Sequence, residues 1–474
     1  MTFPDSAMLG NWILSWIQTD GAIHGFHNHS VWGGNPYRWS DFTAGHSTWA
    51  SPFLAGMSHA LAKQPHAEGA ALLSRLIQFQ TSSFQPDGQY AHIGFQVGEL
   101  LNFGLIHNAI TNLSLGLAAL NGREYLPDAD IQSIRQAVLK NMEACQRYGG
   151  GRATHNATAN QDYARLWGKL VFQQAFDDRR WYDEIPQDLD FMIEHFHVGG
   201  FPDDECVATY RSLNDLSAVE PAEYYGLMIC PLVMAYEVYG DQKYLDQAGR
   251  ICRHVARSAW QDERGHIRFH RMWYQRDGHW IKNRQPMLIA GMGDSLEGIH
   301  AYLQHMPDPE LEHFLKRCDE TYAHYQNARG YFASATGWQS EVDIAPSTAW
   351  HAHDFRYLTR RQSVDTAFWE RFFAPYEKMS VLLGDQCLWF EYGDYWQIRD
   401  YFWQDVYALL GRKDEVTFGR DMVWIGGDRA LPVHYQCPDA PVFLRTDDAI
   451  YLVSGDEEQI DLTSVAALPY RGKS

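Results

Sequence analysis

Positive charge is scarce in this sequence. Lysine and arginine contribute 39 residues against 59 aspartates and glutamates, which gives a formal net charge of −20. A nucleic-acid-binding surface needs a basic stripe that neutralises phosphates, and docking on an anionic lipid surface needs the same. We therefore expect neither nucleic acid nor a membrane among the partners, although a few arginines in a pocket can still hold an acidic substrate.

Cysteine pairs and long apolar runs are also missing. The seven cysteines are an odd number, and no two have Cys-x-x-Cys spacing, which favours reduced core residues. No run of about 18 apolar residues is present, so no transmembrane span is expected. The N-terminus has no basic segment followed by an apolar one. The chain as given is therefore predicted to be cytoplasmic, unless a signal has been trimmed from it.

Familiar catalytic motifs are absent as well. The run Gly149-Gly150-Gly151 lacks the lysine and the serine or threonine of a phosphate-binding loop. Neither a Gly-x-Ser-x-Gly elbow nor an HExxH zinc motif occurs. Histidines at alternate positions, such as His351 and His353, have a spacing that can share a metal, but no second group of ligands supports one. We therefore predict no cofactor and no metal, and interpret these histidines as sugar contacts or loop packing.

Aromatic residues, in contrast, are abundant. Tryptophan, tyrosine and phenylalanine number 17, 26 and 24, or 14% of the chain, and histidine adds 22. Aromatic planes pack against the C–H faces of pyranose rings, while their polar edges form hydrogen bonds with hydroxyls. Most of these residues are expected in the core, but the excess also favours a carbohydrate substrate.

A recurring helical pattern organises the chain. Helical segments begin after polar, aromatic-rich loops roughly 50 to 70 residues apart, near residues 39–41, 90–92, 155–162, 220–225, 284–287 and 346–353. The first helix of a repeat, for example 41–61, 95–120 or 224–239, is apolar on nearly all faces and is predicted to be buried. The second helix, for example 134–148, 242–260 or 311–326, is polar on one face and is predicted to face solvent.

This alternation predicts the fold class and the domains. One buried and one half-exposed helix, repeated about six times, is typical of an all-α (α/α)6 toroid, which we predict for residues 1–414 as the catalytic domain. Residues 415–474 contain short β-prone runs between Gly, Pro and Asp, and predict a small β-rich segment packed on the toroid. Asp241 and Asp308 are predicted helix N-caps, and the Asp277-Gly278 step predicts a β-hairpin within 267–284.

Two segments carry a resemblance to a known superfamily. Trp39-Ser40-Asp41-Phe42-Thr43-Ala44-Gly45 resembles the Trp-rich opening of an inner helix in six-hairpin glycosidases, and Tyr236-Glu237-Val238-Tyr239-Gly240-Asp241 looks like their hairpin turn. The unsaturated glucuronyl and rhamnogalacturonyl hydrolases are the nearest members. The resemblance is architectural, covers about residues 10 to 410, and does not extend to the loop that holds those hydrolases' catalytic aspartate. It implies a toroidal carbohydrate enzyme, and polysaccharide lyases and sugar 2-epimerases share the same ring.

Carboxylates at the openings of the buried helices are the first catalytic candidates. A buried carboxylate is costly unless it caps a helix, pairs with a partner or performs chemistry. Glycosidic cleavage needs a proton donor and usually a second carboxylate. The sequence predicts Asp41 and Asp162 as this pair, with Glu99 and Glu223 in reserve. The carboxylates that lie inside or at the start of a helix predicted to be buried are Asp41, Glu99, Asp162, Glu223, Asp294 and Glu297.

The segment 155–165 is the densest polar cluster. His155 and Asp162 fall on one helical face, which is continued by Arg165. In a glycoside hydrolase, Asp162 protonates the leaving oxygen while Asn156 and Asn160 hold hydroxyls.

The same segment also fits two other reactions. In a polysaccharide lyase, His155 or Tyr163 removes the C5 proton of a uronate whose carboxylate is neutralised by Asn160 and Arg165. In a sugar 2-epimerase or isomerase, two histidines such as His155 and His351 transfer the proton. A binding module without catalysis is the non-enzyme alternative. The sequence predicts a hydrolase acting on a uronate-containing saccharide, and leaves the sugar, the linkage and the oligomeric state open.

Further substrate contacts are predicted beside the helix openings. Tryptophan and tyrosine can form platforms for sugar rings, and an arginine can meet a carboxylate. The predicted contacts are Trp39, His46, Trp49, His92, Tyr224, Arg284, Trp350, His351 and Trp389.

Overall fold

The structure is a computed structural model, and the described residues are mostly helical. They are residues 3–17, 19–23, 47–91, 104–146, 159–195, 210–211, 217–218, 222–262, 264–270, 273–276, 279–282, 286–287, 291–332, 348–376, 381–383, 387–392, 395–400, 406–412, 416–418, 422–425, 429–432, 442–445 and 450–453. None of the helices in these ranges is long and apolar enough to cross a membrane.

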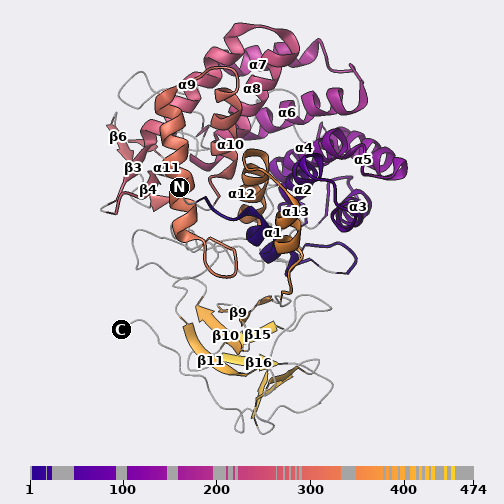
Figure 1. The fold of residues 1–474 in the computed structure, drawn as a ribbon, viewed down its shortest axis with the longest axis vertical. Coiled ribbons are helices and arrows are strands. Elements are labelled where there is room, and N and C mark those ends of the chain that lie inside the picture. Colours follow the sequence, from indigo (N-terminus) through magenta and orange to yellow (C-terminus); the bar gives the residue numbers. More distant parts are fainter. Residues whose placement is uncertain are drawn as a thin grey trace.

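Six helices contact one another in a circular order. They are α2 (Pro52–Lys63), α4 (Gly104–Gly122), α6 (Ala159–Phe176), α8 (Gly226–Tyr239), α10 (Gly293–Leu303) and α12 (Thr348–Arg361). Each packs against the next, and α12 packs against α2, so the order closes on itself. Figure 1 shows the six labels around a circle. This arrangement is consistent with an α/α toroid.

A second set of helices lies outside the first. It consists of α3 (Ala67–Ser82), α5 (Asp128–Gln146), α7 (Glu184–His195), α9 (Gln242–Ser258), α11 (Pro309–Tyr325) and α13 (Thr366–Phe372). Helices α3, α5, α7, α9 and α11 each pack against the circle helix that precedes them, and Figure 1 shows them farther out. Helix α1 (Ser6–Leu14) packs against α12 and α13.

Burial follows the polarity that the sequence predicts. In α8 every residue from Gly226 to Ala235 is buried, whereas α9 buries one face and exposes the other. The two predicted N-caps are confirmed. The Asp241 carboxylate accepts from the backbone N–H of Lys243, and the Asp308 carboxylate accepts from that of Glu310.

Helices α10 and α12 are joined by a buried ionic network. Glu297 accepts from Arg356 Nε at 2.6 Å and from Arg360 Nη1 at 2.9 Å. Burial alone would raise the pKa of Glu297, but the two guanidinium groups outweigh it and lower that pKa to about 2. Glu297 is therefore an anion that holds two helices together.

Strands occur in two regions of the described chain. Between α7 and α10 they form two sheets. The first contains β1 (Tyr210–Arg211), β2 (Ser217–Ala218), β5 (Trp273–Arg276) and β6 (His279–Lys282). The second contains β3 (Ala259–Gln261), β4 (Ile267–His270) and β7 (Pro286–Met287). The antiparallel pair β5–β6 confirms the predicted hairpin. After α13 come β8 (Val381–Leu383), β9 (Cys387–Tyr392), β10 (Tyr395–Asp400), β11 (Val406–Arg412), β12 (Val416–Phe418), β13 (Met422–Ile425), β14 (Arg429–Pro432), β15 (Val442–Arg445) and β16 (Ile450–Val453).

The change from helix to strand comes earlier than the sequence pattern indicates. The four-stranded sheet in the order β11-β10-β9-β8 begins at Val381, whereas the sequence pattern predicts the C-terminal β-strands only from residue 415 onward. Its strands contain Trp, Tyr and Phe, which suit strands as well as buried helices, so composition did not separate them. The division of the chain into domains stays a prediction.

Candidate functional site

The starts of the circle helices carry buried polar side chains. Short connections make each outer helix run back along its partner, so all circle helices start at the same end. Within their first two turns, or just before α8 in the short helix η3 (Ala222–Tyr224), lie polar side chains that are at most 7% exposed. They include His107 of α4, Asp162 of α6, Glu223 of η3, Asp294 of α10 and His353 of α12.

Two of these side chains form a hydrogen-bonded dyad. His353 Nδ1 lies 2.7 Å from Asp294 Oδ1, and Arg356 Nη2 donates to the same oxygen at 2.8 Å. An imidazole that donates Nδ1–H to a carboxylate presents the lone pair of Nε2. No hydrogen bond to His353 Nε2 is found among the residues that the structure describes. The dyad therefore offers a base with a fixed tautomer.

The dyad is held by close packing between α10 and α12. A Cβ atom on Gly293 would lie 2.7 Å from the carbonyl oxygen of His353, so only glycine lets the two helix starts approach this closely. The Asp354 carboxylate accepts from the backbone N–H groups of Gly291 and Gly293 at 2.9 and 3.0 Å, and from Tyr322 Oη at 2.6 Å. Burial raises the pKa of Asp354 to about 7 against these hydrogen bonds.

Asp162 has a different environment. Burial raises its pKa to about 6, although Arg165, 3.5 Å away, opposes the rise. Arg165 is shared with Asp188, which lies 3.3 Å from it, and among the described residues no hydrogen-bond partner is found for Asp162 Oδ2. A carboxyl group with this pKa is partly protonated near neutral pH, as a general acid must be. Neighbouring Asn160 is buried too.

Tyr163 is fully buried on α6. No partner for its hydroxyl is found within the described part of the chain, and burial raises the pKa of the phenol well above its ordinary value. Because the phenolate is the form that removes a proton, this environment disfavours Tyr163 as a base.

The structure describes the surroundings of four further candidates, and for Trp389 it gives only a place in a sheet. The Trp49 and His107 rings lie 5.2 Å apart, Trp350 is buried against Gly291, and Tyr224 is half-buried. His351 Nε2 accepts from the backbone N–H of Phe332 at 3.0 Å, and its ring lies 4.7 Å from that of Trp12. Trp389 lies on β9 opposite Ile398.

Several predicted site residues lie outside the described residues, so their roles stay predictions. They are Trp39, Asp41, His46, His92, Glu99, His155, Asn156 and Arg284. Within the described ranges, no group of three or more histidine, cysteine, aspartate or glutamate side chains has an arrangement that could hold a metal ion.

Comparison with known proteins gives the fold. No family model and no curated protein matches the sequence. A sugar epimerase from a ruminal bacterium matches the structure with a TM-score of 0.54 at 12% identity, over 76% of this chain and 96% of that one. A D-mannose isomerase matches with a TM-score of 0.53 at 12% identity, over 75% and 95%. The chain has the fold of the six-hairpin glycosidase-like enzymes.

The expected resemblance is thus confirmed at the level of architecture. An unsaturated glucuronyl hydrolase specific for heparin also matches, at 11% identity over 76% of this chain and 97% of that one, but with a TM-score of 0.48. Identities this low carry no residue-by-residue correspondence, so the chemistry has to be argued from the site itself.

The sequence pattern does not single out His353 and Asp294 as a pair. His353 stood out only for its spacing from His351, and Asp294 only as one of several carboxylates. A signal was available in helical spacing. Asp294 and Glu297 are three residues apart on α10, and His353, Arg356 and Arg360 recur at intervals of three and four on α12. Two complementary charged faces of this kind predict an interhelical network.

Proposed function

We propose that this protein is a carbohydrate-active enzyme that epimerises or isomerises a reducing sugar at C2, with His353 as the group that transfers the proton. One observation carries the proposal: the His353–Asp294 pair, anchored by Arg356, stands at the start of the circle helices with Nε2 of the imidazole directed away from its carboxylate partner.

The chemistry requires a positioned base and, for epimerisation, a proton donor on the other side of C2. In the open-chain form of an aldose, the carbonyl at C1 acidifies the proton on C2. Removal of that proton by His353 Nε2 leaves an enediolate, and the imidazolium that forms is stabilised by the Asp294 carboxylate. Return of a proton from the imidazolium to C1, with the hydroxyl proton passing from O2 to O1, gives the ketose. Delivery of a proton to the opposite face of C2 by a donor on that side gives the epimer. No atom is gained or lost overall.

The fold supports the same proposal. We infer that the circular order of helices is an (α/α)6 toroid, whose end at the helix starts receives the sugar. Two solved structures that match with TM-scores of 0.54 and 0.53 are described as a sugar epimerase and a D-mannose isomerase. A binding module without catalysis would have no need of a buried histidine whose tautomer is fixed by a carboxylate.

Product analysis tests this proposal. Purified protein is incubated with mannose, glucose and cellobiose, and the products are separated by chromatography. We expect an epimer or a ketose in which every glycosidic bond remains intact. Monosaccharides released from cellobiose without any change at C2 would contradict the proposal.

A second candidate is a glycoside hydrolase acting on a uronate-containing saccharide, and the raised pKa of Asp162 is the observation that favours it. Its second carboxylate would be Asp41, which lies outside the described residues. For the third candidate, a polysaccharide lyase, burial disfavours the phenolate of Tyr163, and the other candidate base, His155, lies outside the described residues.

Asp162→Asn separates the hydrolase from the epimerase. If Asp162 is a general acid, this substitution lowers the hydrolytic rate by about 10²- to 10⁴-fold. A general acid works in its protonated form, so the wild-type rate should fall as pH rises through about 6. Asp183→Asn on the exposed surface is the matched control. Unchanged hydrolysis in Asp162→Asn would exclude this role.

A further inference from the structure

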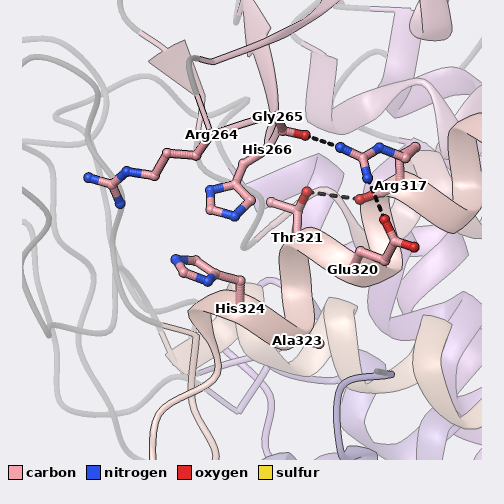
Figure 2. A pocket seen from close by; sticks show the side chains of 8 residues that line it. All are labelled: Arg264, Gly265, His266, Arg317, Glu320, Thr321, Ala323 and His324. Atoms are coloured by element: carbon pink, nitrogen blue, oxygen red, sulfur yellow. Dashed lines mark hydrogen bonds and ion pairs between the residues drawn. The ribbon is translucent and has the colours of Figure 1, made fainter. Parts of the chain in front are cut away.

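A pocket on the outer side of the helices has a chemistry that the proposed reaction does not use. It has a volume of about 360 Å³ and lies between the turn that joins β3 to β4 and the last turns of α11 (Figure 2). Its lining residues are Arg264, Gly265, His266, Arg317, Glu320, Thr321, Ala323 and His324.

The pocket concentrates groups that are cationic or can become so. Arg264 and His266 come from the turn, and Arg317 and His324 come from α11. Among the lining residues that the structure describes, Glu320 is the one acidic side chain. In a chain with a formal net charge of −20, such a concentration of basic groups is a local exception that would attract anions.

The walls of the pocket are held in place by internal contacts. Arg317 donates to the carbonyl oxygen of Gly265 and, at 2.6 Å, to Glu320 Oε2. Gly265 has a φ of +80°, which glycine adopts without strain. Asp262 accepts from the backbone N–H groups of Arg264 and His266 at 3.0 and 2.9 Å. These contacts fix the turn before any ligand arrives.

The two histidine rings, His266 and His324, lie close together in the pocket, with their planes tilted by 32°. Their ring centroids are 4.0 Å apart, and Figure 2 shows both rings extending in the same direction from the two walls. Two imidazolium ions at this distance repel each other, and an anion beside them removes that repulsion. Anion binding should therefore be coupled to protonation of this pair.

The groups that face the histidine pair favour the same ligand. On the turn, Asp262 lies 3.8 Å from His266 Nδ1, but its charge is already compensated by Arg268 at 3.0 Å. On α11, Tyr325 Oη lies 3.4 Å from His266 Nδ1, and the carboxylate of Glu320 is paired with Arg317. Arg264 adds a further positive charge on the turn.

We propose that this pocket binds an oxyanion of the phosphate class, held by the histidine pair and Arg264, while Arg317 adds positive charge from the other side of the pair. Guanidinium groups and cationic imidazoles are strong hydrogen-bond donors to phosphate oxygens. Histidine changes charge between about pH 5 and 8, so binding should be tighter at about pH 6 than at about pH 8. The site lies outside the proposed reaction centre and does not depend on the proposed function.

Calorimetric titration of the full chain with inorganic phosphate, in a buffer free of other oxyanions, tests the site. We expect saturable binding of one phosphate at about pH 6, weakened about tenfold or more in Arg264→Gln and in His324→Gln. His313→Gln and Arg253→Gln are the matched controls, since both residues are exposed on outer helices and outside the pocket.

Glu320→Gln should strengthen phosphate binding, whereas Arg264→Gln and His324→Gln should weaken it. Glu320→Gln removes the one carboxylate among the described lining residues and ends the Glu320 contact of Arg317, so phosphate should bind severalfold more tightly than to the wild type. A second titration, with glycerol phosphate, shows whether the pocket prefers a phosphate ester or the free phosphate ion. Affinity equal to or above that for inorganic phosphate supports a phosphate ester, and weaker affinity supports the free ion.

Two results would overturn the site. One is the absence of saturable phosphate binding by the wild type at about pH 6. The other is equal binding by the wild type, Arg264→Gln and His324→Gln, which would place the anion elsewhere on the chain.

Discussion

His353→Gln is expected to lower the rate of C2 epimerisation or isomerisation by about 10²- to 10⁴-fold, the range that general-base catalysis contributes. Glutamine fills a similar volume and can still donate to Asp294, but its amide cannot accept a proton at neutral pH. Initial rates on the aldose that the wild type converts best, measured beside a chemical unfolding curve, check this result.

Asp294→Asn is the companion variant to His353→Gln. An amide in place of the carboxylate no longer stabilises the imidazolium and can reverse the tautomer of His353, so the rate should also fall, with a changed pH profile. His313→Gln, on the exposed face of α11, should leave the rate unchanged. Full activity in a folded His353→Gln variant would remove this histidine from the mechanism.

Glu297→Gln is expected to produce the largest loss of stability, about 3–5 kcal/mol in the free energy of unfolding. Glu297 is fully buried and is the shared counter-ion of Arg356 and Arg360, so the substitution takes this anion from Arg360 and leaves Arg356 with Asp294 as its remaining anionic partner. Urea unfolding followed by circular dichroism measures the loss. Glu312→Gln, exposed on α11, is the matched control and should unfold like the wild type.

The same carboxylate predicts how stability depends on pH. Its pKa is lowered from an ordinary value near 4.5 to about 2 in the folded chain. A carboxyl group whose pKa is depressed by folding stabilises the protein above its ordinary pKa, and that contribution is lost as pH falls toward the folded value. Glu297→Gln should therefore lose less stability than the wild type between about pH 4.5 and 2. Parallel losses in the two proteins would contradict this assignment.

Much of the helical pattern can be predicted from the sequence, because the spacing of apolar residues differs between a helix buried on all faces and a helix buried on one face. The predicted segment 224–239 corresponds to α8 (Gly226–Tyr239), and 311–326 corresponds to α11 (Pro309–Tyr325). The caps Asp241 and Asp308 follow from local chemistry alone, since the side chain bonds to a backbone group two residues away.

The candidate site follows from the sequence only in part. The pattern locates it at the helix starts and selects Asp162, whose burial and raised pKa the structure describes. It does not pair His353 with Asp294, because these residues are 59 positions apart and meet only when α10 packs on α12. The spacing of residues along one helix does not determine which other helix packs against it, so contacts between side chains of two helices cannot be predicted from that spacing.

Proton exchange at C2 tests the central claim most directly. The wild type is incubated in heavy water with the aldose that it converts, and the sugars are recovered and analysed by nuclear magnetic resonance. We predict that deuterium from the solvent enters at C2 of the epimer, or at C1 of the ketose, while glycosidic bonds stay intact. Turnover that leaves C1 and C2 free of deuterium and releases new reducing ends would contradict the account.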